Sequence, residues 1–198
     1  MSQKHDDWRE DALNCVRTLR GGGVVLSSTD TVWGLATDAT HEQGVARIFE
    51  LKSRPIHETL LMLVDSDGML EHLIPGLPEA AWELIEVSDR PVTLVGQLNP
   101  NCRYRFAPGL VRADGSIAVR WVRDDYLAFM VNGLGRPIAS TSANPSGFPT
   151  PNSFSEVDSN LVSGVDLAAA SGRHDEKKNP PSMLVRFDEA GRIQILRS

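Results

Sequence analysis

The segment best suited to chemistry is PIASTSANPSG, which runs from Pro137 to Gly147. A short apolar strand leads directly into small hydroxyl and amide residues. Small residues let a backbone approach a ligand closely, and Ser, Thr and Asn offer both donors and acceptors there. Loops at strand ends often hold small molecules in α/β proteins. The alternative interpretation is a turn that needs Asn, Pro, Ser and Gly for its backbone angles.

Other polar segments also lie at the ends of predicted strands and helices. They are Ser28–Thr31, Lys52–Arg54, Ala118–Arg120, Pro181–Met183 and Ile195–Arg197. Each has a simple structural explanation, such as a helix dipole, a solvated surface charge, an Asx turn or a fraying chain end. Together they predict one concave site with several cations, hydroxyls and an amide, without an obvious nucleophile. Such a site suits a polyanion and an amino acid, because nucleotidyl transfer depends on positioning and charge neutralisation.

Composition argues against several classes of protein. The five His residues are scattered, without metal-ligand spacing, and neither a G-x-S-x-G elbow nor a P-loop is present. A net charge of −6 makes direct RNA binding less expected. Two cysteines fit a reduced, cytoplasmic setting. The charged N-terminus is not a signal peptide, and no apolar run approaches the ~18 residues of a membrane span.

Hydrophobic spacing predicts the elements that position these segments. Helices are expected over 8–19, from a Thr40–Gln43 capping box to about 52, from Pro78 as first residue, and from about 124 to a stop at Gly133. Strands are expected at 24–26, 60–64, 92–95, 117–120, 137–139, 165–168, 183–187 and 193–196, with a hairpin turn over 188–191. We therefore predict one mixed α/β domain over 1–198, a twisted mixed sheet flanked by helices, with residues 1–20 as its N-terminal helix.

The order and spacing of these segments resemble the YrdC family. STDTVWGLATDA resembles its P-T-[DE]-T-V-Y-G-L segment, Lys52-Ser53-Arg54-Pro55 its K-x-R-P, and Ser142-Ala143-Asn144 its S-x-N. The likeness runs from about 22 to 197 and fits the family's short, single-domain form. It implies a concave, positively charged groove. It also implies synthesis of L-threonylcarbamoyladenylate and pyrophosphate from L-threonine, bicarbonate and ATP. A partner enzyme then transfers the threonylcarbamoyl group to adenosine 37 of tRNA.

The resemblance implies roles for individual residues in binding L-threonine. Thr31 would contact the amino acid, and Arg120 would pair with its carboxylate, in a bidentate way if the geometry permits. Ser142 and Ser182 would complete this pocket.

Other residues would, by the same resemblance, bind the nucleotide. Lys52 and Arg54 would face the ATP phosphates as the catalytic cations. Further contacts with ATP would come from Asn144, Asn152, Ser116 and Arg197. Mg²⁺ would enter bound to ATP, because the sequence offers no dedicated carboxylate cage. The polar stretch 171–181 would close over the site as a lid.

The chain departs from the family pattern at a few positions. Ser28 replaces a proline, Trp33 a tyrosine and Met183 a threonine, and we expect the first two to be tolerated. Glu58 stands at the family's second lysine, followed by Thr59. An acid beside a phosphate repels it by about 1–4 kcal/mol at partly screened distances. Either Glu58 points away, or it binds Mg²⁺ or a neighbouring cation, or ATP binding is weaker.

Two other functions compete with the synthase. One is a diverged nucleotide-binding paralogue without synthase activity, for which Glu58 is the motive. The other is an RNA-binding or ribosome-associated factor on the same fold, using local arginines at 103, 105, 112, 120 and 123. Salt-sensitive RNA binding without threonine-dependent ATP turnover would favour the RNA-binding factor.

Overall fold

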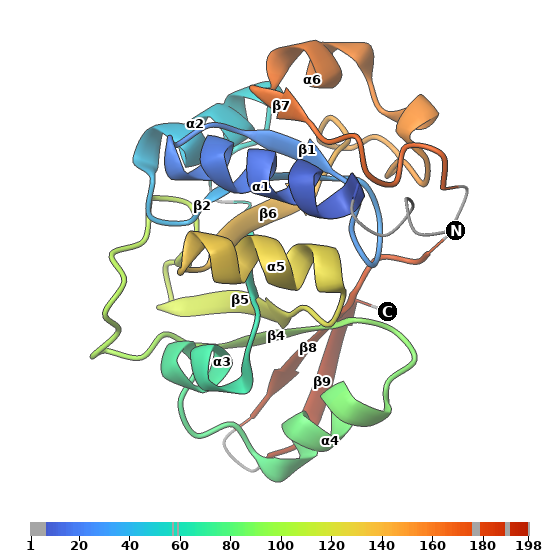
Figure 1. Cartoon of the computed structure of the whole chain (residues 1–198). Helices are drawn as coiled ribbons and strands as arrows, with labels where there is room; N and C mark the ends of the chain where they lie inside the picture. The colour runs from blue at the N-terminus through green and yellow to red at the C-terminus, as the bar shows by residue number, and fades with distance from the viewer. Residues whose placement is uncertain (1–6, 57, 59, 176–178, 189–190, 198) are drawn as a thin grey trace.

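Across the residues that the computed structural model describes (7–56, 58, 60–175, 179–188 and 191–197), nine strands form one mixed sheet, with helices on both faces (Figure 1). The helices are α1 (Asp7–Arg20), α2 (Glu42–Leu51), α3 (Asp67–Leu73), α4 (Glu79–Val87), α5 (Asp125–Leu134) and α6 (Ser159–Gly164), with a short 3-10 turn at Phe154–Glu156. The strands are β1 (Val25–Ser27), β2 (Gly34–Asp38), β3 (Leu61–Val64), β4 (Val92–Gln97), β5 (Ser116–Trp121), β6 (Ile138–Ser142), β7 (Leu167–Ala168), β8 (Met183–Phe187) and β9 (Ile193–Arg197).

The strands lie in the order β7-β1-β2-β6-β3-β5-β4-β8-β9. The pairs β1–β7, β3–β5 and β4–β8 are parallel, and the others are antiparallel. The predicted mixed α/β architecture is therefore confirmed. None of the helices in the described part of the chain has the length and apolar character needed to cross a membrane.

The two faces of the sheet are covered differently. Side chains alternate between faces along a strand, and one set, including Ile117 and Val119 of β5, packs with α2, α3 and α4 in the larger core. On the opposite face α1 and α5 pack against each other and over one end of the sheet (Figure 1). The rest of that second face includes Ala118 and Arg120 of β5, which line a cavity.

The predicted helices exist, but three of their ends differ from expectation. Helix α2 is capped by His41, whose Nδ1 accepts the Gly44 N–H at 3.1 Å, so the Thr40–Gln43 capping box is wrong. Thr40 instead donates its hydroxyl to Asp38 at 2.7 Å. Pro78 is the N-cap of α4 rather than its first helical residue.

Helix α5 also ends later than predicted. It continues through Gly133 and stops at Gly135, which takes the left-handed conformation with φ 77°. A Cβ at Gly133 would lie 2.9 Å from a methyl group of Val16. The glycine at 133 thus permits the close approach of α1 and α5, and the glycine at 135 ends the helix.

The C-terminal part of the chain forms the predicted pair of strands. Strands β8 and β9 pair antiparallel, and Gly191 and Arg192 hydrogen-bond with Asp188 at the connection. Residues 189–190 of the predicted turn lie outside the described residues, as do 176–178 of the stretch 171–181. The lid therefore stays a prediction.

Candidate active site

A cavity of about 230 Å³ lies over the second face of the sheet, beside the region that α1 and α5 cover. Its polar lining consists of arginines and hydroxyl residues, namely Arg54, Arg112, Arg120, Arg197, Thr29, Thr31, Ser140, Thr141, Ser142, Thr150 and Ser182. Strands β5 and β6 supply Arg120 and Ser140 to Ser142, so this part of the lining is fixed by strand pairing, while loops supply much of the rest. Six of the residues predicted for the site therefore meet in one place: Thr31, Arg54, Arg120, Ser142, Ser182 and Arg197.

Arg120 lies in the floor of the cavity and is only 3% exposed. Its Nη1 donates to Thr31 Oγ1 at 3.0 Å, and its Nη2 lies 3.0 Å from Asp30 Oδ1. Burial lowers the pKa of this guanidinium, which Asp30 partly offsets, and burial raises the pKa of Asp30 against the effect of Arg120. Within the described residues, Arg120 Nε has no hydrogen-bond partner. Asp30 Oδ1 also has none, because its contact with Arg120 Nη2 has the distance of an ion pair but not the geometry of a hydrogen bond. Such a buried cation is suited to bind a carboxylate, because the low local dielectric strengthens the pairing.

Thr29 organises the loop that carries Asp30 and Thr31. Its Oγ1 accepts the N–H groups of Thr31 at 3.0 Å and Val32 at 3.1 Å and donates to the Val32 carbonyl at 2.7 Å. A threonine hydroxyl bonded to the backbone two residues on makes a tight local turn. This turn directs the Thr31 hydroxyl to Arg120.

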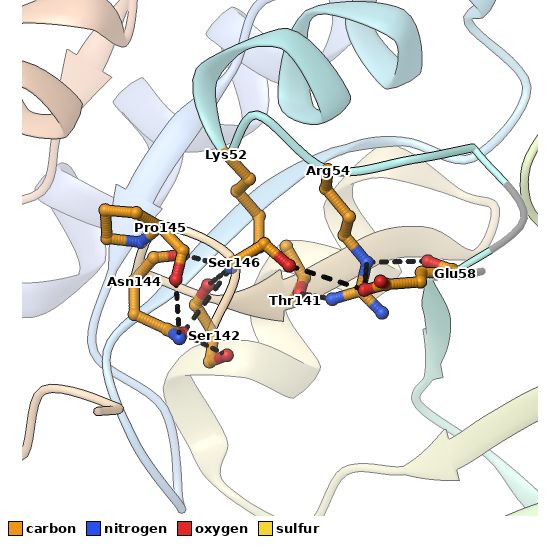
Figure 2. Close-up of polar contacts among 8 residues, drawn as sticks. All are labelled: Lys52, Arg54, Glu58, Thr141, Ser142, Asn144, Pro145 and Ser146. Atoms are coloured by element: carbon orange, nitrogen blue, oxygen red, sulfur yellow. Dashed lines mark hydrogen bonds and ion pairs between the residues drawn. The ribbon is translucent and has the colours of Figure 1, made fainter. Parts of the chain in front are cut away.

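The side chains of Lys52 and Arg54 leave the end of α2 and reach different partners (Figure 2). Ser53 adopts φ 48°, and the N–H groups of Ser53 and Arg54 return to the carbonyls of Glu50 and Phe49, both at 2.9 Å. This is the Schellman ending, which normally takes glycine at the left-handed position. The reversal separates two cations that stand only two positions apart in the sequence.

Lys52 turns into the protein and is 1% exposed. Its Nζ donates to the carbonyls of Ser142 and Asn144, each at 2.5 Å, and lies 3.4 Å from Asn144 Oδ1. The Lys52 carbonyl in turn accepts the Ser146 N–H at 3.0 Å. Burial, and secondarily Arg54, lowers the pKa of Lys52 to about 8. Lys52 thus fixes the loop after β6 and is not among the residues that line the cavity.

Arg54 reaches the mouth of the cavity. Its Nη1 donates to Thr141 Oγ1 at 3.3 Å, and its Nε donates to the Glu58 carbonyl at 2.6 Å. The Glu58 carboxylate lies 3.4 Å from the same Nε (Figure 2). Burial lowers the pKa of Arg54, and Glu58 opposes that effect. Of the alternatives for Glu58, the structure supports engagement of a neighbouring cation.

Strands β8 and β9, with the residues just before β8, complete the cavity lining. Ser182 shares a hydrogen bond of 2.8 Å with Thr93 of β4, and its carbonyl accepts from Arg197 at 3.2 Å. Arg197 lies one residue from the C-terminus, but it belongs to β9 and lines the cavity.

Three predicted nucleotide contacts lie outside this cavity lining. Asn144 uses its side chain within its own loop, accepting from Ser142 at 2.5 Å and donating to the Phe148 carbonyl at 2.7 Å. Ser116 is buried and donates to Asp114 at 2.6 Å. Asn152 lines a smaller neighbouring cavity that shares Thr31 with the main one.

Sequence reasoning missed Arg112 as a site residue. It lines the cavity, and its Nη1 is buried without a hydrogen-bond partner in the described residues. Burial, followed by Arg186, lowers its pKa. Arg112 lies in the segment before β5, outside any of the polar segments singled out in the sequence, and no spacing pattern marked it.

The donor set of the site is cationic. No group of three or more His, Cys, Asp or Glu side chains in the described residues is placed to hold a metal ion. The arginines and hydroxyls instead suit oxyanions, since guanidinium groups can bind carboxylate and phosphate oxygens through two parallel hydrogen bonds.

Comparison with known proteins places the chain among named relatives. A family profile called Sua5_yciO_yrdC, described as "Telomere recombination", matches residues 17–198. The threonylcarbamoyl-AMP synthase of Saccharophagus degradans is 32% identical over 154 residues, 77% of this chain and 79% of that protein. The enzyme of that name from Stutzerimonas stutzeri is 31% identical over 175 residues, 88% and 90% of the two chains.

A solved structure of P. abyssi Sua5 complexed with L-threonine is also similar, with a TM-score of 0.78 and 28% identity. The alignment covers 96% of this chain but only 54% of the Sua5 chain, so this chain spans about half the length of that structural relative.

Proposed function

Because the chain belongs to the Sua5–YciO–YrdC family, we propose that its cavity makes L-threonylcarbamoyladenylate and pyrophosphate from L-threonine, bicarbonate and ATP. The protein is then a nucleotidyltransferase that serves threonylcarbamoyladenosine modification of tRNA adenosine 37. The observation that carries the proposal is the single cavity in which a buried Arg120–Thr31 pair lies with three further arginines.

The buried end of the cavity suits the amino acid. Arg120 is held by Thr31 and Asp30, so its guanidinium is pre-oriented for the L-threonine carboxylate. The hydroxyls of Ser142 and Ser182 supply further polar contacts in the same cavity. The L-threonine bound to P. abyssi Sua5 supports this choice of substrate.

The arginines nearer the mouth suit ATP. Arg54, Arg112 and Arg197 neutralise phosphate oxygens, while Lys52 holds the loop after β6 in place. Asn144 supports the same loop through its side-chain hydrogen bonds. For Ser116 and Asn152 we propose the contacts with ATP that the family resemblance implies. Preorganised donors of this kind are typically worth about 2–4 kcal/mol each in the transition state.

The reaction proceeds in two steps. The threonine amine, once deprotonated, forms a C–N bond with the carbon of bicarbonate, and water leaves. A carbamate oxygen then attacks the α-phosphorus of ATP, the bond to the β-phosphate oxygen breaks, and pyrophosphate leaves. Both partners of the second step are anions, so the arginines lower its barrier by neutralising the phosphates.

The proposal extends to the surroundings of the reaction. Mg²⁺ would enter bound to ATP and would supply additional charge neutralisation on the phosphates, since the described residues of this cationic site include no carboxylate cluster to hold it. A tRNA threonylcarbamoyl transferase consumes the product in the cytoplasm, because a mixed anhydride hydrolyses in water unless it is passed on.

The test is pyrophosphate release from Mg-ATP, with L-threonine and bicarbonate omitted in turn. Release that requires both, together with threonylcarbamoyl-AMP detected by mass spectrometry, is the expected result. Binding of ATP or threonine without release would favour the diverged paralogue. RNA binding in place of turnover would favour the RNA-binding factor.

A further inference from the structure

Glu58 joins two segments at the mouth of the cavity (Figure 2). Its own N–H donates to the Pro55 carbonyl at 3.0 Å, which closes a turn after Arg54. Its carbonyl and its carboxylate both face Arg54 Nε, at 2.6 and 3.4 Å. The same carboxylate oxygen, Oε2, lies 3.4 Å from the hydroxyl of Ser146, in the loop that Lys52 holds. The acid therefore connects the Arg54 turn with the loop after β6.

These contacts fix one edge of the Arg54 guanidinium. Nε is directed to Glu58, while Nη1 is directed to Thr141 at the cavity wall. A guanidinium is planar, so holding Nε on one side sets the direction of its two terminal nitrogens. An unrestrained arginine loses up to about 2 kcal/mol of side-chain entropy when a ligand immobilises it. A preformed orientation reduces that loss.

We propose that Glu58 is a positioning residue for the phosphate site, which it serves by holding the terminal nitrogens of Arg54 toward the cavity. The proposal rests on the proposed function, since the oxyanion it concerns is the triphosphate of ATP. Where the family pattern has a second lysine, this chain lacks that cation and instead has an acid that orients Arg54. The two effects of an acid here have opposite signs: repulsion of the phosphates weakens binding, and orientation of Arg54 strengthens it. We expect orientation to outweigh repulsion, because the carboxylate lies 3.4 Å from both Arg54 Nε and the Ser146 hydroxyl and so adds to the hydrogen bond that Nε donates to the Glu58 carbonyl.

The experiment compares Glu58→Gln with the matched control Glu50→Gln. Both remove one negative charge, but Glu50 lies in the last turn of α2 with an exposed side chain. Binding of ATP and of inorganic tripolyphosphate is measured by titration calorimetry, and KM for ATP and for L-threonine by pyrophosphate release. An exposed ion pair contributes modestly, so Glu58→Gln is expected to weaken tripolyphosphate binding and to raise KM for ATP about two- to fivefold. KM for L-threonine and kcat are expected to stay within about twofold of the wild-type values. The melting temperature is expected to stay within about a degree or two.

A double-mutant cycle shows whether Glu58 acts through Arg54. In an Arg54→Ala background, Glu58→Gln is expected to cause no further loss of phosphate binding, because no guanidinium remains to be oriented. An equal loss in that background would overturn the proposal. So would tighter binding by Glu58→Gln than by Glu50→Gln, which would mean that repulsion dominates.

The two proposals fail in different ways. A wild-type protein that binds tripolyphosphate but releases no pyrophosphate would overturn the synthase function, while the binding comparison would still decide the role of Glu58. A wild-type protein that binds neither ATP nor tripolyphosphate would overturn both.

Discussion

Two arginine–carboxylate pairs bound the cavity, and they differ in their exposure to water. In the floor, the side chains of Arg120 and Asp30 are 4% and 19% exposed. At the mouth, those of Arg54 and Glu58 are 22% and 43% exposed. A buried pair cannot lose one partner without leaving an uncompensated charge, whereas a solvated pair contributes about 0–1 kcal/mol. An arginine–carboxylate pair therefore contributes to the stability of the fold in the floor and only orients a side chain at the mouth.

The supporting structure differs in the same way. Arg120 lies within β5, between β3 and β4, and is fixed by strand pairing on both sides. Arg54 follows the end of α2, where its direction depends on Ser53, Lys52 and Glu58. Changes at the floor should therefore affect both stability and threonine use. Changes at the mouth should affect ATP use alone. A change at the buried Lys52 is the exception, because it should lower stability as well.

The largest effect is expected for Arg120→Ala. This change leaves the partly buried Asp30 without its cation; breaking a fully buried pair costs about 3–5 kcal/mol, and the 19% exposure of Asp30 favours the lower end. The free energy of unfolding, measured with urea, should fall by that order, and KM for L-threonine should rise much more than KM for ATP.

The double variant Arg120→Ala/Asp30→Asn separates the two losses. Removing the orphaned charge should restore part of the stability, but threonine use should remain lost. Recovery of both would contradict a direct role of Arg120 in binding the amino acid.

Lys52→Met should have the next largest effect. It leaves the carbonyls of Ser142 and Asn144 without their donor, and unsatisfied buried acceptors cost about 1–3 kcal/mol. The loop after β6 loosens, so we expect KM for ATP to rise about tenfold or more, the effect of losing about 1.4 kcal/mol, with KM for L-threonine affected less.

Arg54→Met is the matched comparison for Lys52→Met, because it removes a cation from the same segment. It should raise KM for ATP while the free energy of unfolding changes by less than about 1 kcal/mol. Equal stability losses in the two variants would contradict the distinction between a buried Lys52 and a partly solvated Arg54.

Much of this fold could be predicted from the sequence, because apolar spacing marks the buried sides of long elements. The residues Ala12, Cys15 and Leu19 define the buried side of α1, and Val45 and Ile48 that of α2. Strand β2 went unpredicted because its sequence, GLATD, is small and polar although every residue in it is buried. Helices α3 and α6 are too short, at seven and six residues, to show a clear period.

The site could be predicted only in part. The order of the polar segments indicated that Thr31, Arg120, Ser142 and Ser182 share one cavity, and they do. The direction of Lys52 could not be predicted, because it depends on carbonyls of a segment about ninety residues away and on a left-handed Ser53. The pairing of Arg54 with Glu58 likewise follows from a turn whose geometry no residue pattern marks.

A pH comparison tests the burial of Lys52, which holds the loop after β6. The pKa of Lys52 is about 8 in the folded protein, below its ordinary value of 10.5, because the charged form is buried. Between these two values the unfolded chain binds more protons than the folded one, so this residue makes stability rise with pH. Below pH 8 both states carry the proton, so the burial of the charged lysine destabilises the fold by its full, constant amount.

The free energy of unfolding of the wild type should therefore rise relative to Lys52→Met by about 1–2 kcal/mol from pH 7.5 to 9.5. The arginines of the floor keep their charge across this window, so Arg120→Ala should change stability by a similar amount at both pH values. Urea unfolding at the two pH values measures both differences, and a constant gap between wild type and Lys52→Met would contradict the assigned burial.

The smallest effect is expected at Ser53. A non-glycine residue in the left-handed region carries strain of about 1–2 kcal/mol, and glycine relieves it while giving up about 0.5–1 kcal/mol of chain entropy. Ser53→Gly should therefore stabilise the protein by at most about 1.5 kcal/mol. Ser53→Val should destabilise it, because a β-branched side chain fits this conformation poorly. If the contacts that Arg54 Nε makes to the Glu58 carbonyl and carboxylate orient Arg54, Ser53→Gly leaves KM for ATP unchanged, as measured by pyrophosphate release. A higher KM for ATP with unchanged stability would instead mean that the strained Ser53, rather than Glu58, directs Arg54 into the cavity.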